Sequence, residues 1–388
     1  MIRNFTFFVP VKLVFGEGKL EAAGEEAKAY GKKALVVTTG DFFIKTGLVD
    51  RLKAILKKSG VEAFHYWDVS PNPLNTEIDA AAAFAKKNGC ELCIGLGGGS
   101  AIDTAKAAAI VLGHGRPIWD FCTGATAAPI TAKTLPIIAI TTTAGTGSEG
   151  TQWSVITNKA VKEKPGIGSD HTFAKVAIVD PELMVSMPPR TTASTGFDAL
   201  AHSIEAYTST LSTPITDLYC EQAIRLIGKY LRRAVKDGAD KEARNGMAYA
   251  NTLAGFSIAV GIVTVCHGLA HSVGGIANTT HGECLAAMTP QTMRFSMRGN
   301  PDKFKNIGMF LRDEPANLGQ DRLEDSVREV ERLIADAGLA NGLGKQGVKE
   351  SDIEAIADGV IRYMGGSIAI DPMNPGKKDL VEILKKSM

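Results

Sequence analysis

Four of the seven histidines, together with one aspartate, are spaced as the ligands of a metal ion would be. Asp198 and His202 are four residues apart, as are His267 and His271, and His281 follows soon after. Residues four apart lie on one face of a helix. One carboxylate and two or three imidazoles can surround a divalent cation and leave a coordination position open. The pattern therefore predicts a metal-dependent enzyme.

The ligand types restrict the ion without selecting one. A set of one oxygen and three nitrogens suits Fe(II), Zn(II), Mn(II) or Co(II). The spacing differs from the metalloprotease motif His-Glu-x-x-His, because no glutamate lies between the paired residues to act as a general base. We expect the other three histidines, His65, His114 and His171, to lie at the surface.

A run of glycines after a short apolar segment predicts a phosphate-binding loop. The predicted strand 92–96 continues into Gly97, Gly98, Gly99 and Ser100. Glycines let a backbone approach a phosphate closely, and the N-terminus of a following helix offers free N–H groups. Ser100 and Asp103 have the spacing of a helix N-cap and its acidic partner. The loop is not GxGxxG, so the usual Rossmann fingerprint is absent, and a tight turn between strand and helix is the alternative.

A second polar loop follows the predicted strand 135–141. It runs from Thr141 to Glu149 and carries Thr142, Thr143 and Thr146 among its hydroxyl residues, with two glycines. Ligands of open α/β sheets bind at the carboxyl ends of strands, where such hydroxyls suit a ribose, a phosphate or a carboxamide. A solvated loop of the same composition is the alternative.

The elements that must position these loops change in character along the chain. The first half alternates short β-rich runs, at 33–38, 61–66, 92–96, 135–141 and 176–179, with helical patterns at 48–58 and 77–87. This alternation predicts a parallel sheet with helices on both faces. Helical periodicity then dominates at 215–236, 240–260, 282–297, 302–312, 322–337, 351–364 and 378–387. We predict an α/β domain over 1–187 and an all-helical domain over 188–388 that contains the whole metal pattern.

Composition argues against several classes of protein. The 388 residues carry a net charge of +1, which gives no support to nucleic-acid binding or a membrane-surface role. The apolar runs are too short to span a bilayer, and residues 1–5 lack the apolar core of a signal peptide. We therefore expect a cytoplasmic enzyme, with its six cysteines present as buried thiols.

With these motifs in hand, the chain resembles the iron-containing (group III) alcohol dehydrogenase family over nearly its whole length. The resemblance rests on Phe15-Gly16, Pro71-Asn72-Pro73, Gly97-Gly98-Gly99-Ser100 with Asp103 and Lys106, Thr142-Thr143-Ala144-Gly145-Thr146 with Glu149, Gly196-Phe-Asp198-Ala-Leu-Ala-His202, His267-Gly-Leu-Ala-His271, His281-Gly282 and Asn374-Pro375.

The resemblance implies a Rossmann-like NAD(P)-binding domain and a helical metal-binding domain, in an architecture similar to dehydroquinate synthase, with the nicotinamide cofactor in the cleft between them. It implies hydride transfer between a primary alcohol or short diol, or the corresponding aldehyde, and NAD or NADP. Asp198, His202, His267 and His281 would hold Fe(II), or Zn(II), and His271 would relay the alcohol proton beside the nicotinamide. Cofactor contacts would come from Gly40, Asp41, Asn72, Gly97, Gly98, Gly99, Ser100, Asp103, Thr142, Thr143, Thr146 and Lys164. A homodimer or larger homo-oligomer is expected.

Three departures from the family pattern concern specificity. Many members carry an aspartate for the adenosine ribose where this chain has Thr39 or Gly40, with Asp41 displaced, which leaves the choice between NAD and NADP open. Trp153 could narrow the substrate pocket. Residues 255–266, which include Phe256 and Cys266, are more apolar than in many relatives and favour an apolar substrate tail.

Three other functions fit the sequence less well. A glycerol or polyol dehydrogenase of the same superfamily would want several polar groups in its pocket, and the apolar stretch 256–266 argues mildly against it. A metal-dependent lyase or cyclase that uses NAD transiently would need several basic residues near the metal, and none lies between His267 and His281. A scaffold protein with a vestigial site fits the intact ligand pattern poorly.

Overall fold

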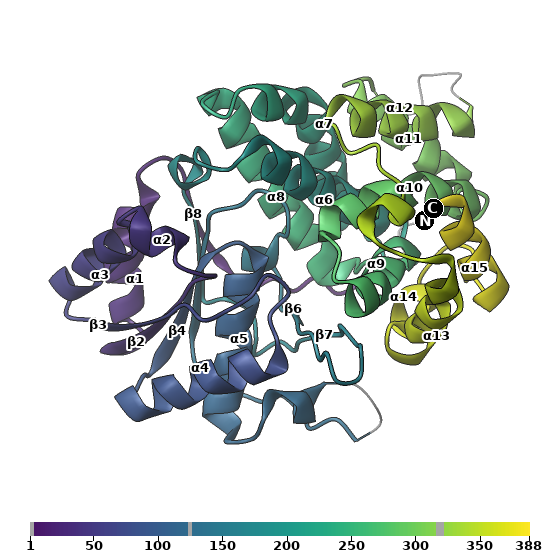
Figure 1. The fold of residues 1–388 in the computed structure, drawn as a ribbon. Helices are drawn as coiled ribbons and strands as arrows, with labels where there is room; N and C mark the ends of the chain where they lie inside the picture. Colours follow the sequence, from purple (N-terminus) through teal and green to yellow (C-terminus); the bar gives the residue numbers. More distant parts are fainter. Residues whose placement is uncertain (1–3, 123–125, 316–321) are drawn as a thin grey trace. The chain divides into compact units, whose positions relative to one another are not determined.

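The structure, a computed structural model, describes residues 4–122, 126–315 and 322–388 (Figure 1). The chain divides into two compact units. The sheet unit consists of Val9–Thr143 and Ser148–Met184, and the helical unit consists of the described residues before Val9, the segment Ala144–Gly147, and Val185–Met388. These units are defined by contacts within the chain, and the division into two domains, 1–187 and 188–388, stays a prediction.

The sheet unit is built on a six-stranded parallel sheet with the order β1-β8-β5-β4-β2-β3. Its strands are β1 (Lys12–Phe15), β2 (Lys33–Val37), β3 (Glu62–Tyr66), β4 (Leu92–Gly97), β5 (Ile137–Thr141) and β8 (Val176–Val179). A short antiparallel pair, β6 (Ser154–Val155) and β7 (Gly166–Ile167), stands outside that sheet. The predicted parallel sheet is confirmed. The edge strand β1 and the pair β6–β7 were not predicted.

Helices cover both faces of this sheet (Figure 1). They are α1 (Ala23–Lys28), α2 (Phe42–Lys45), α3 (Leu48–Lys58), α4 (Asn75–Asn88) and α5 (Gly99–His114). Side chains alternate between the faces along a strand. Val36 of β2 therefore packs with α1 and α3, whereas its neighbours Leu35 and Val37 pack with α4 and α5. Strands buried on both faces explain the continuous apolar runs in the sequence.

Chain order places the predicted loops at one edge of the sheet. From β2 the chain first adds β3 on one side and then β4 on the other, which makes the position between β2 and β4 a topological switch point. Ligands of open α/β sheets bind at the carboxyl ends of the strands at such a point. The segments that leave β2, β4 and β5 at this edge contain Gly40, the three glycines at 97–99, and Thr142 with Thr143.

The helical unit contains α6 (Pro189–Thr208), α7 (Pro214–Lys236), α8 (Lys241–Val260), α9 (Val265–Ala277), α10 (His281–Ser296), α11 (Pro301–Leu311), α12 (Leu323–Asp336), α13 (Ile353–Tyr363), α14 (Gly365–Ala369) and α15 (Lys377–Lys386). The all-helical prediction is confirmed, and the seven predicted segments have bounds close to those of seven of these helices. α6, α9 and α14 were not among the predicted segments. Among the described residues no single helix is long and apolar enough to cross a membrane; α8 and α9 pass that test only as a pair bent by 98°.

The sequence also predicted which of the remaining histidines are exposed and that the cysteines are buried. His171 is exposed as expected, but the prediction for His65 is wrong: it is 8% exposed, and its Nε2 lies 2.9 Å from the hydroxyl of Thr38. His114 is half-buried and bonded to Thr131. β3 is an edge strand, but His65 lies opposite Val36 of β2, and its ring is covered by Trp67, with ring centroids 5.3 Å apart, and bonded to Thr38; surface placement therefore failed. All six cysteines are free and buried, as predicted.

Candidate metal centre and cofactor loops

Three helices of the helical unit supply the predicted metal ligands. Asp198 and His202 lie one turn apart on α6, His267 lies in the first turn of α9, and His281 is the first residue of α10. α6 begins at Pro189, where a proline is well tolerated because the first N–H of a helix has no partner within the helix. Asp198, His202 and His267 are buried.

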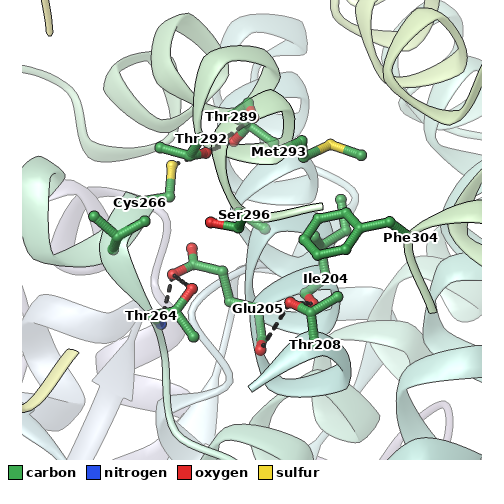
Figure 2. A pocket seen from close by; sticks show the side chains of 12 residues that line it. Ile204, Glu205, Thr208, Thr264, Cys266, Thr289, Thr292, Met293, Ser296 and Phe304 are labelled. Carbon is green, nitrogen blue, oxygen red and sulfur yellow. Dashed lines mark hydrogen bonds between the residues drawn. The ribbon is translucent and has the colours of Figure 1, made fainter. Parts of the chain in front are cut away.

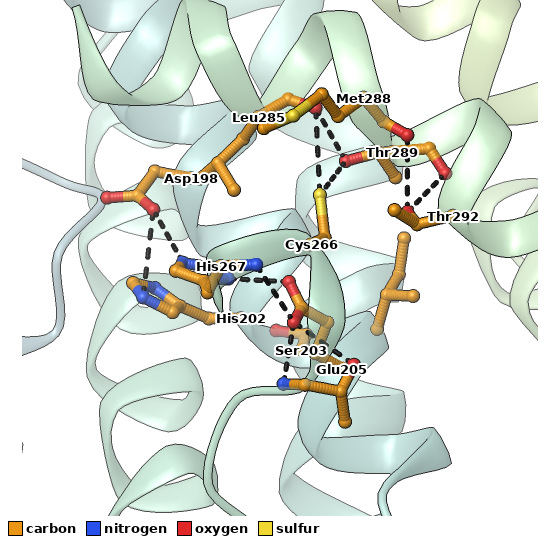
Figure 3. A network of polar contacts seen from close by, with 12 residues as sticks. Asp198, His202, Ser203, Glu205, Cys266, His267, Leu285, Met288, Thr289 and Thr292 are labelled. Carbon is orange, nitrogen blue, oxygen red and sulfur yellow. Dashed lines mark hydrogen bonds and ion pairs between the residues drawn. The ribbon is translucent and has the colours of Figure 1, made fainter. Parts of the chain in front are cut away.

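The donor atoms of these side chains converge on one carboxylate oxygen. Asp198 Oδ1 lies 3.4 Å from Nε2 of His267, 3.6 Å from Nε2 of His202 and 3.8 Å from Nε2 of His281. Figure 3 shows the first two of these contacts. The donor atoms of Asp198, His267 and His281 all lie within 4.8 Å of one another. Neighbouring ligands of one tetrahedral ion at about 2.1 Å are separated by about 3.4 Å, so the arrangement fits a divalent metal.

The buried donors support this interpretation. Asp198 Oδ1 and His267 Nε2 are shielded from solvent, and neither makes a hydrogen bond. Buried polar atoms in native proteins normally have a partner, and a bound metal ion would be the partner of these two atoms. The stacked rings of His202 and His267, with centroids 4.4 Å apart, bring two basic nitrogens beside the same carboxylate. The residues present therefore fit a metal ion.

In His202 and His267 the other ring nitrogen, Nδ1, also makes a hydrogen bond. His202 Nδ1 donates to the carbonyl oxygen of Gly145 at 3.2 Å, and His267 Nδ1 donates to Glu205 Oε1 at 2.5 Å. A proton held on Nδ1 leaves the Nε2 lone pair available to a metal. Both rings are thus held in the tautomer that a ligand requires.

Burial and charge act in opposite directions on the two rings. Burial lowers the pKa of His202, and the carboxylate of Asp198 only partly offsets this effect. Burial also lowers the pKa of His267, but the carboxylates of Glu205 and Asp198 together outweigh it and bring the pKa to about 9. Protons and metal ions therefore compete for His267 in solution.

Close backbone packing fixes the position of His281. A Cβ atom on the next residue, Gly282, would lie 2.0 Å from the carbonyl oxygen of Ser194, so α10 can approach α6 this closely only with glycine there. One residue further on, Glu283 accepts hydrogen bonds from Arg190 Nε at 2.5 Å and Nη2 at 2.8 Å. The first turn of α10 is thereby anchored to the first turn of α6.

His271 lies one turn after His267 on α9 and is buried. Its ring centroid is 5.5 Å from that of His281 and 6.4 Å from that of His267. It belongs to the same histidine cluster, but the donors that all lie within 4.8 Å of one another are those of Asp198, His267 and His281. His202 also stands outside that mutual group, although its Nε2 lies 3.6 Å from Asp198 Oδ1.

The predicted cofactor loops of the sheet unit meet one another. Gly97, at φ +151°, ends β4, and its carbonyl oxygen accepts from the N–H of Thr142 at 3.0 Å. A Cβ on Gly98 would lie 3.0 Å from Thr143, which shows how closely the two loops approach. The glycine run is needed for this packing, and it leaves the N–H groups of the first turn of α5 uncovered by side chains.

A second group of predicted cofactor residues lies together beside this helix. Lys164 Nζ donates to Asn72 Oδ1 at 2.7 Å, and the N–H of Asn72 donates to Ser100 Oγ at 3.3 Å. Asn72 has a φ of 60°, a conformation that asparagine tolerates better than most residues. The buried ammonium of Lys164 therefore lies one side chain away from the N-terminus of α5.

The predicted capping role of Ser100 and Asp103 is wrong. α5 begins at Gly99 with Gly98 as its N-cap, and no side chain caps it. Ser100 already lies inside the helix, and its hydroxyl accepts from Asn72. Asp103 is buried and accepts from Ser148 Oγ at 2.6 Å and from the N–H of Val155 at 2.9 Å. Asp103 therefore organises the chain after the threonine loop and lies inside the sheet unit.

The chain matches family models, curated relatives and solved structures over nearly its whole length. The family model described as iron-containing alcohol dehydrogenase matches residues 10–181, and that of the C-terminal region of the Fe-containing alcohol dehydrogenase family matches residues 192–388. The chain is 34% identical over 383 residues to an NAD-dependent methanol dehydrogenase of Bacillus methanolicus, covering 98% of this chain and 99% of that protein. It is 35% identical to a 1,3-propanediol dehydrogenase of Citrobacter freundii, with 99% of each chain covered. A crystal structure of an archaeal halo-thermophilic alcohol dehydrogenase from a Red Sea brine pool matches with a TM-score of 0.96 at 36% identity, covering 100% of both chains.

The chain belongs to the iron-containing alcohol dehydrogenase family. The family, the fold and the enzyme class predicted from the sequence are confirmed: the protein is an oxidoreductase of the alcohol dehydrogenase type.

The remaining predicted residues of this dehydrogenase occupy varied environments. Thr146 lies in the segment Ala144–Gly147, whose last N–H donates to Asn251 Oδ1 at 2.8 Å. Trp153 is half-buried, as is Phe256, whose ring centroid is 6.1 Å from that of Tyr219. Cys266 is buried within 3.5 Å of the Thr289 hydroxyl. Their roles toward a substrate stay predictions.

Sequence reasoning about this dehydrogenase missed Glu205, and it named Lys106 as part of a motif without giving it a role. Glu205 lies seven residues after Asp198, which puts both on the same helical face, and this spacing was a signal that could have found it. Lys106 is fully buried in α5, and a lysine in the apolar run Ala105–Ile110 was a comparable signal.

Proposed function

We propose that this dehydrogenase transfers hydride between a primary alcohol or short diol and NAD(P)+, with a divalent ion held by Asp198, His202, His267 and His281. The observation that carries the proposal is the convergence of one buried carboxylate oxygen with three imidazole Nε2 atoms at 3.4–3.8 Å. When bound, the ion would lower the pKa of an alcohol and the nicotinamide would accept its hydride.

The chain's own residues prepare this chemistry in several ways. Gly145 and Glu205 hold the Nδ1 protons of two ligands, so that Nε2 faces the converging site. The burial of Asp198 keeps competing water away from the carboxylate. His271 would take up and release the alcohol proton, because its ring lies 5.5 Å from that of His281 and it is not one of the three imidazoles whose Nε2 atoms lie 3.4–3.8 Å from Asp198 Oδ1.

We propose Fe(II) as the natural ion, with Zn(II) as an ion that the same ligands accept. Family membership supports iron, since both matching models describe iron-containing enzymes. The nitrogen-rich donor set, by itself, serves either ion.

We propose that this enzyme uses NAD, as the name of the NAD-dependent methanol dehydrogenase suggests, and that it also accepts NADP. The N–H groups at the start of α5, with Lys164, would hold the pyrophosphate. At the end of β2, Gly40 offers no carboxylate and has open space around the position of a Cβ. Asp41 is exposed and paired with Lys45 at 2.6 Å, so its charge repels a 2′-phosphate only weakly. Gly40→Asp should therefore lower kcat/KM with NADP far more than with NAD; equal effects on both would contradict this assignment.

We propose short primary alcohols and diols as substrates because relatives carry the names methanol and 1,3-propanediol dehydrogenase. Trp153, Phe256 and Cys266 are the candidates for contacts with the substrate chain. A homo-oligomer and a cytoplasmic location also stay predictions; light scattering of the purified protein tests the first.

Two substitutions test the metal assignment. His267→Ala should abolish both metal binding and turnover, because it removes a converging donor. His271→Ala should lower turnover and retain the metal, because it removes only the proton relay. Metal content measured by elemental analysis together with the rate of NADH formation separates these roles. Wild-type turnover in His267→Ala would refute the ligand assignment, and loss of metal from His271→Ala would make His271 a ligand.

A further inference from the structure

A buried glutamate outside the ligand set is bonded to one of the proposed ligands. Glu205 is 5% exposed and lies on α6, two turns after Asp198 and one turn after His202. Its Oε1 accepts from His267 Nδ1 at 2.5 Å. Its Oε2 accepts from the N–H of Thr264 at 2.6 Å and from the Thr264 hydroxyl at 3.1 Å (Figure 2). The same oxygen accepts from the N–H of His267 at 3.3 Å.

We propose that Glu205 is a positioning residue that holds His267 in the orientation and tautomer required to bind the metal. The inference rests on the proposed metal site. Glu205 is not itself placed among the converging donors; it acts through His267.

One carboxylate performs two tasks here. The first turn of a helix has N–H groups without partners inside the helix, and α9 has no capping side chain from its own N-cap, Thr264. Glu205 supplies that cap from a different helix, since it accepts the N–H groups of Thr264 and His267. A carboxylate at this end also interacts favourably with the helix dipole. The start of α9 and the ring of its metal ligand are therefore fixed by the same group.

Both oxygens of the Glu205 carboxylate must accept hydrogen bonds for it to perform the two tasks at once. A carboxylate offers two accepting oxygens, so one faces His267 Nδ1 and the other faces the Thr264 N–H. An amide of the same shape has one oxygen and one NH2 group. In Glu205→Gln the NH2 group must face a donor on one side or the other, which either turns the His267 ring or uncaps α9. Outer-sphere carboxylates of this kind typically affect metal affinity by about 10–100-fold.

The other side of Glu205 faces a small pocket with a mixed lining, in which Ile204, Met293 and Phe304 lie among hydroxyl groups. Glu205 lines this pocket, which has room for about one water molecule, together with Thr208, Thr264, Thr289 and Ser296 (Figure 2). Ser296 Oγ donates to Asp371 Oδ2 at 2.8 Å, and Asp371 also accepts from the N–H of Met373. Asp371 is thus a second buried carboxylate of the same unit, which also reaches Thr264 and the charge of Glu205 but is bonded to groups other than the proposed ligands. It therefore serves as a control for damage to the start of α9 that does not act through His267.

The experiment compares Glu205→Gln, Glu205→Asp and Asp371→Asn with the full-length wild type. Each protein is stripped of metal with a chelator and titrated with Co(II) against a competing chelating dye, and the visible absorption bands of bound Co(II) are recorded. We expect Glu205→Gln to weaken Co(II) binding by about 10–100-fold and to change the bands. Glu205→Asp, which keeps the charge at a shorter reach, should be weakened less. Asp371→Asn should stay within about threefold of the wild type.

The outcomes separate the inference from the proposed function. A Glu205→Gln protein that binds Co(II) as tightly as the wild type, with unchanged bands, overturns the positioning role and leaves the metal site standing. A wild type that binds no Co(II) overturns the metal site and the inference together. Equal losses in Asp371→Asn and Glu205→Gln also overturn the inference, because they indicate general damage to the helical unit. If Glu205→Gln fails to fold by circular dichroism, Glu205→Asp decides: unchanged affinity and bands refute the role.

Discussion

Replacing Lys106 by methionine should destabilise the sheet unit strongly. The side chain is fully buried on α5, and its Nζ donates to the backbone carbonyl oxygens of Ser148 at 2.7 Å, Thr151 at 2.9 Å and Trp153 at 2.7 Å. These carbonyls belong to the chain that continues from the threonine loop. Methionine fills a similar volume but donates no hydrogen bond, so three carbonyls would be left without this donor.

The magnitude follows from the paired charges. Burial lowers the pKa of Lys106 to about 8, opposed by Asp103 and Glu149. Burial likewise raises the pKa of Asp103, and Lys106 is the strongest opposing influence. Removing one partner of a buried pair usually costs about 3–5 kcal/mol, because the other charge stays buried without compensation. We therefore expect Lys106→Met to lower the free energy of unfolding of the sheet unit by about 3–5 kcal/mol.

A double-mutant cycle distinguishes this explanation from a general packing defect. Asp103→Asn alone should also destabilise the sheet unit, and the double variant should lose less than the sum of the two, with a coupling of about 1–3 kcal/mol. All three tryptophans, Trp67, Trp119 and Trp153, lie in the sheet unit, so tryptophan fluorescence in a urea titration reports its unfolding separately. A loss below about 1 kcal/mol in Lys106→Met, or strictly additive effects, would refute the reasoning.

Two further predictions concern acid stability and helix packing. Burial lowers the pKa of His65 from 6.5 to about 4. The stability that the folded protein gains from neutral His65 is therefore fully present above pH 6.5 and is lost as the pH falls through 4. Between pH 7 and pH 4, urea titrations should show the wild type losing about 3 kcal/mol more than His65→Gln, and parallel pH profiles would contradict this. Gly282→Ala should push α10 away from α6, lower the stability of the helical unit by about 1–3 kcal/mol and weaken metal binding. Gly366→Ala is the control and should have little effect, because its new Cβ meets nothing within 4 Å. Calorimetry measures the stability of both variants, and a metal titration measures their affinity. Equal results for the two variants would refute the close approach of α10 to α6.

Much of the fold could be predicted because local patterns and tertiary packing agree. The amphipathic run 215–236 became α7, since its N-cap Thr213 and its apolar stripe both favour the same helix. The apolar run 92–96 became the central strand β4, because a strand covered on both faces needs apolar residues on both. The edge strand β1 has only half-buried or exposed residues, so its sequence carried a weaker signal.

The candidate site was predictable where spacing within one helix defines it. Asp198 with His202 and His267 with His271 could be paired on helical faces from sequence alone. The contact of Glu205 with His267 joins residues 62 positions apart, and only the packing of α6 on α9 reveals it. The capping prediction for Ser100 failed for a related reason: tertiary partners, Asn72 and the residues that bond Asp103, compete with the local motif.

The central claim is that metal held by the converging donors is required for alcohol oxidation, and reconstitution tests it most directly. Protein purified without oxygen is stripped with a chelator, then assayed for NADH and NADPH formation with short primary alcohols and diols, before and after addition of Fe(II) or Zn(II). The account predicts that turnover is lost on chelation and returns with about one ion per chain, and that Asp198→Ala neither binds the ion nor recovers. Full turnover in the metal-free protein, or recovery of Asp198→Ala, would contradict it.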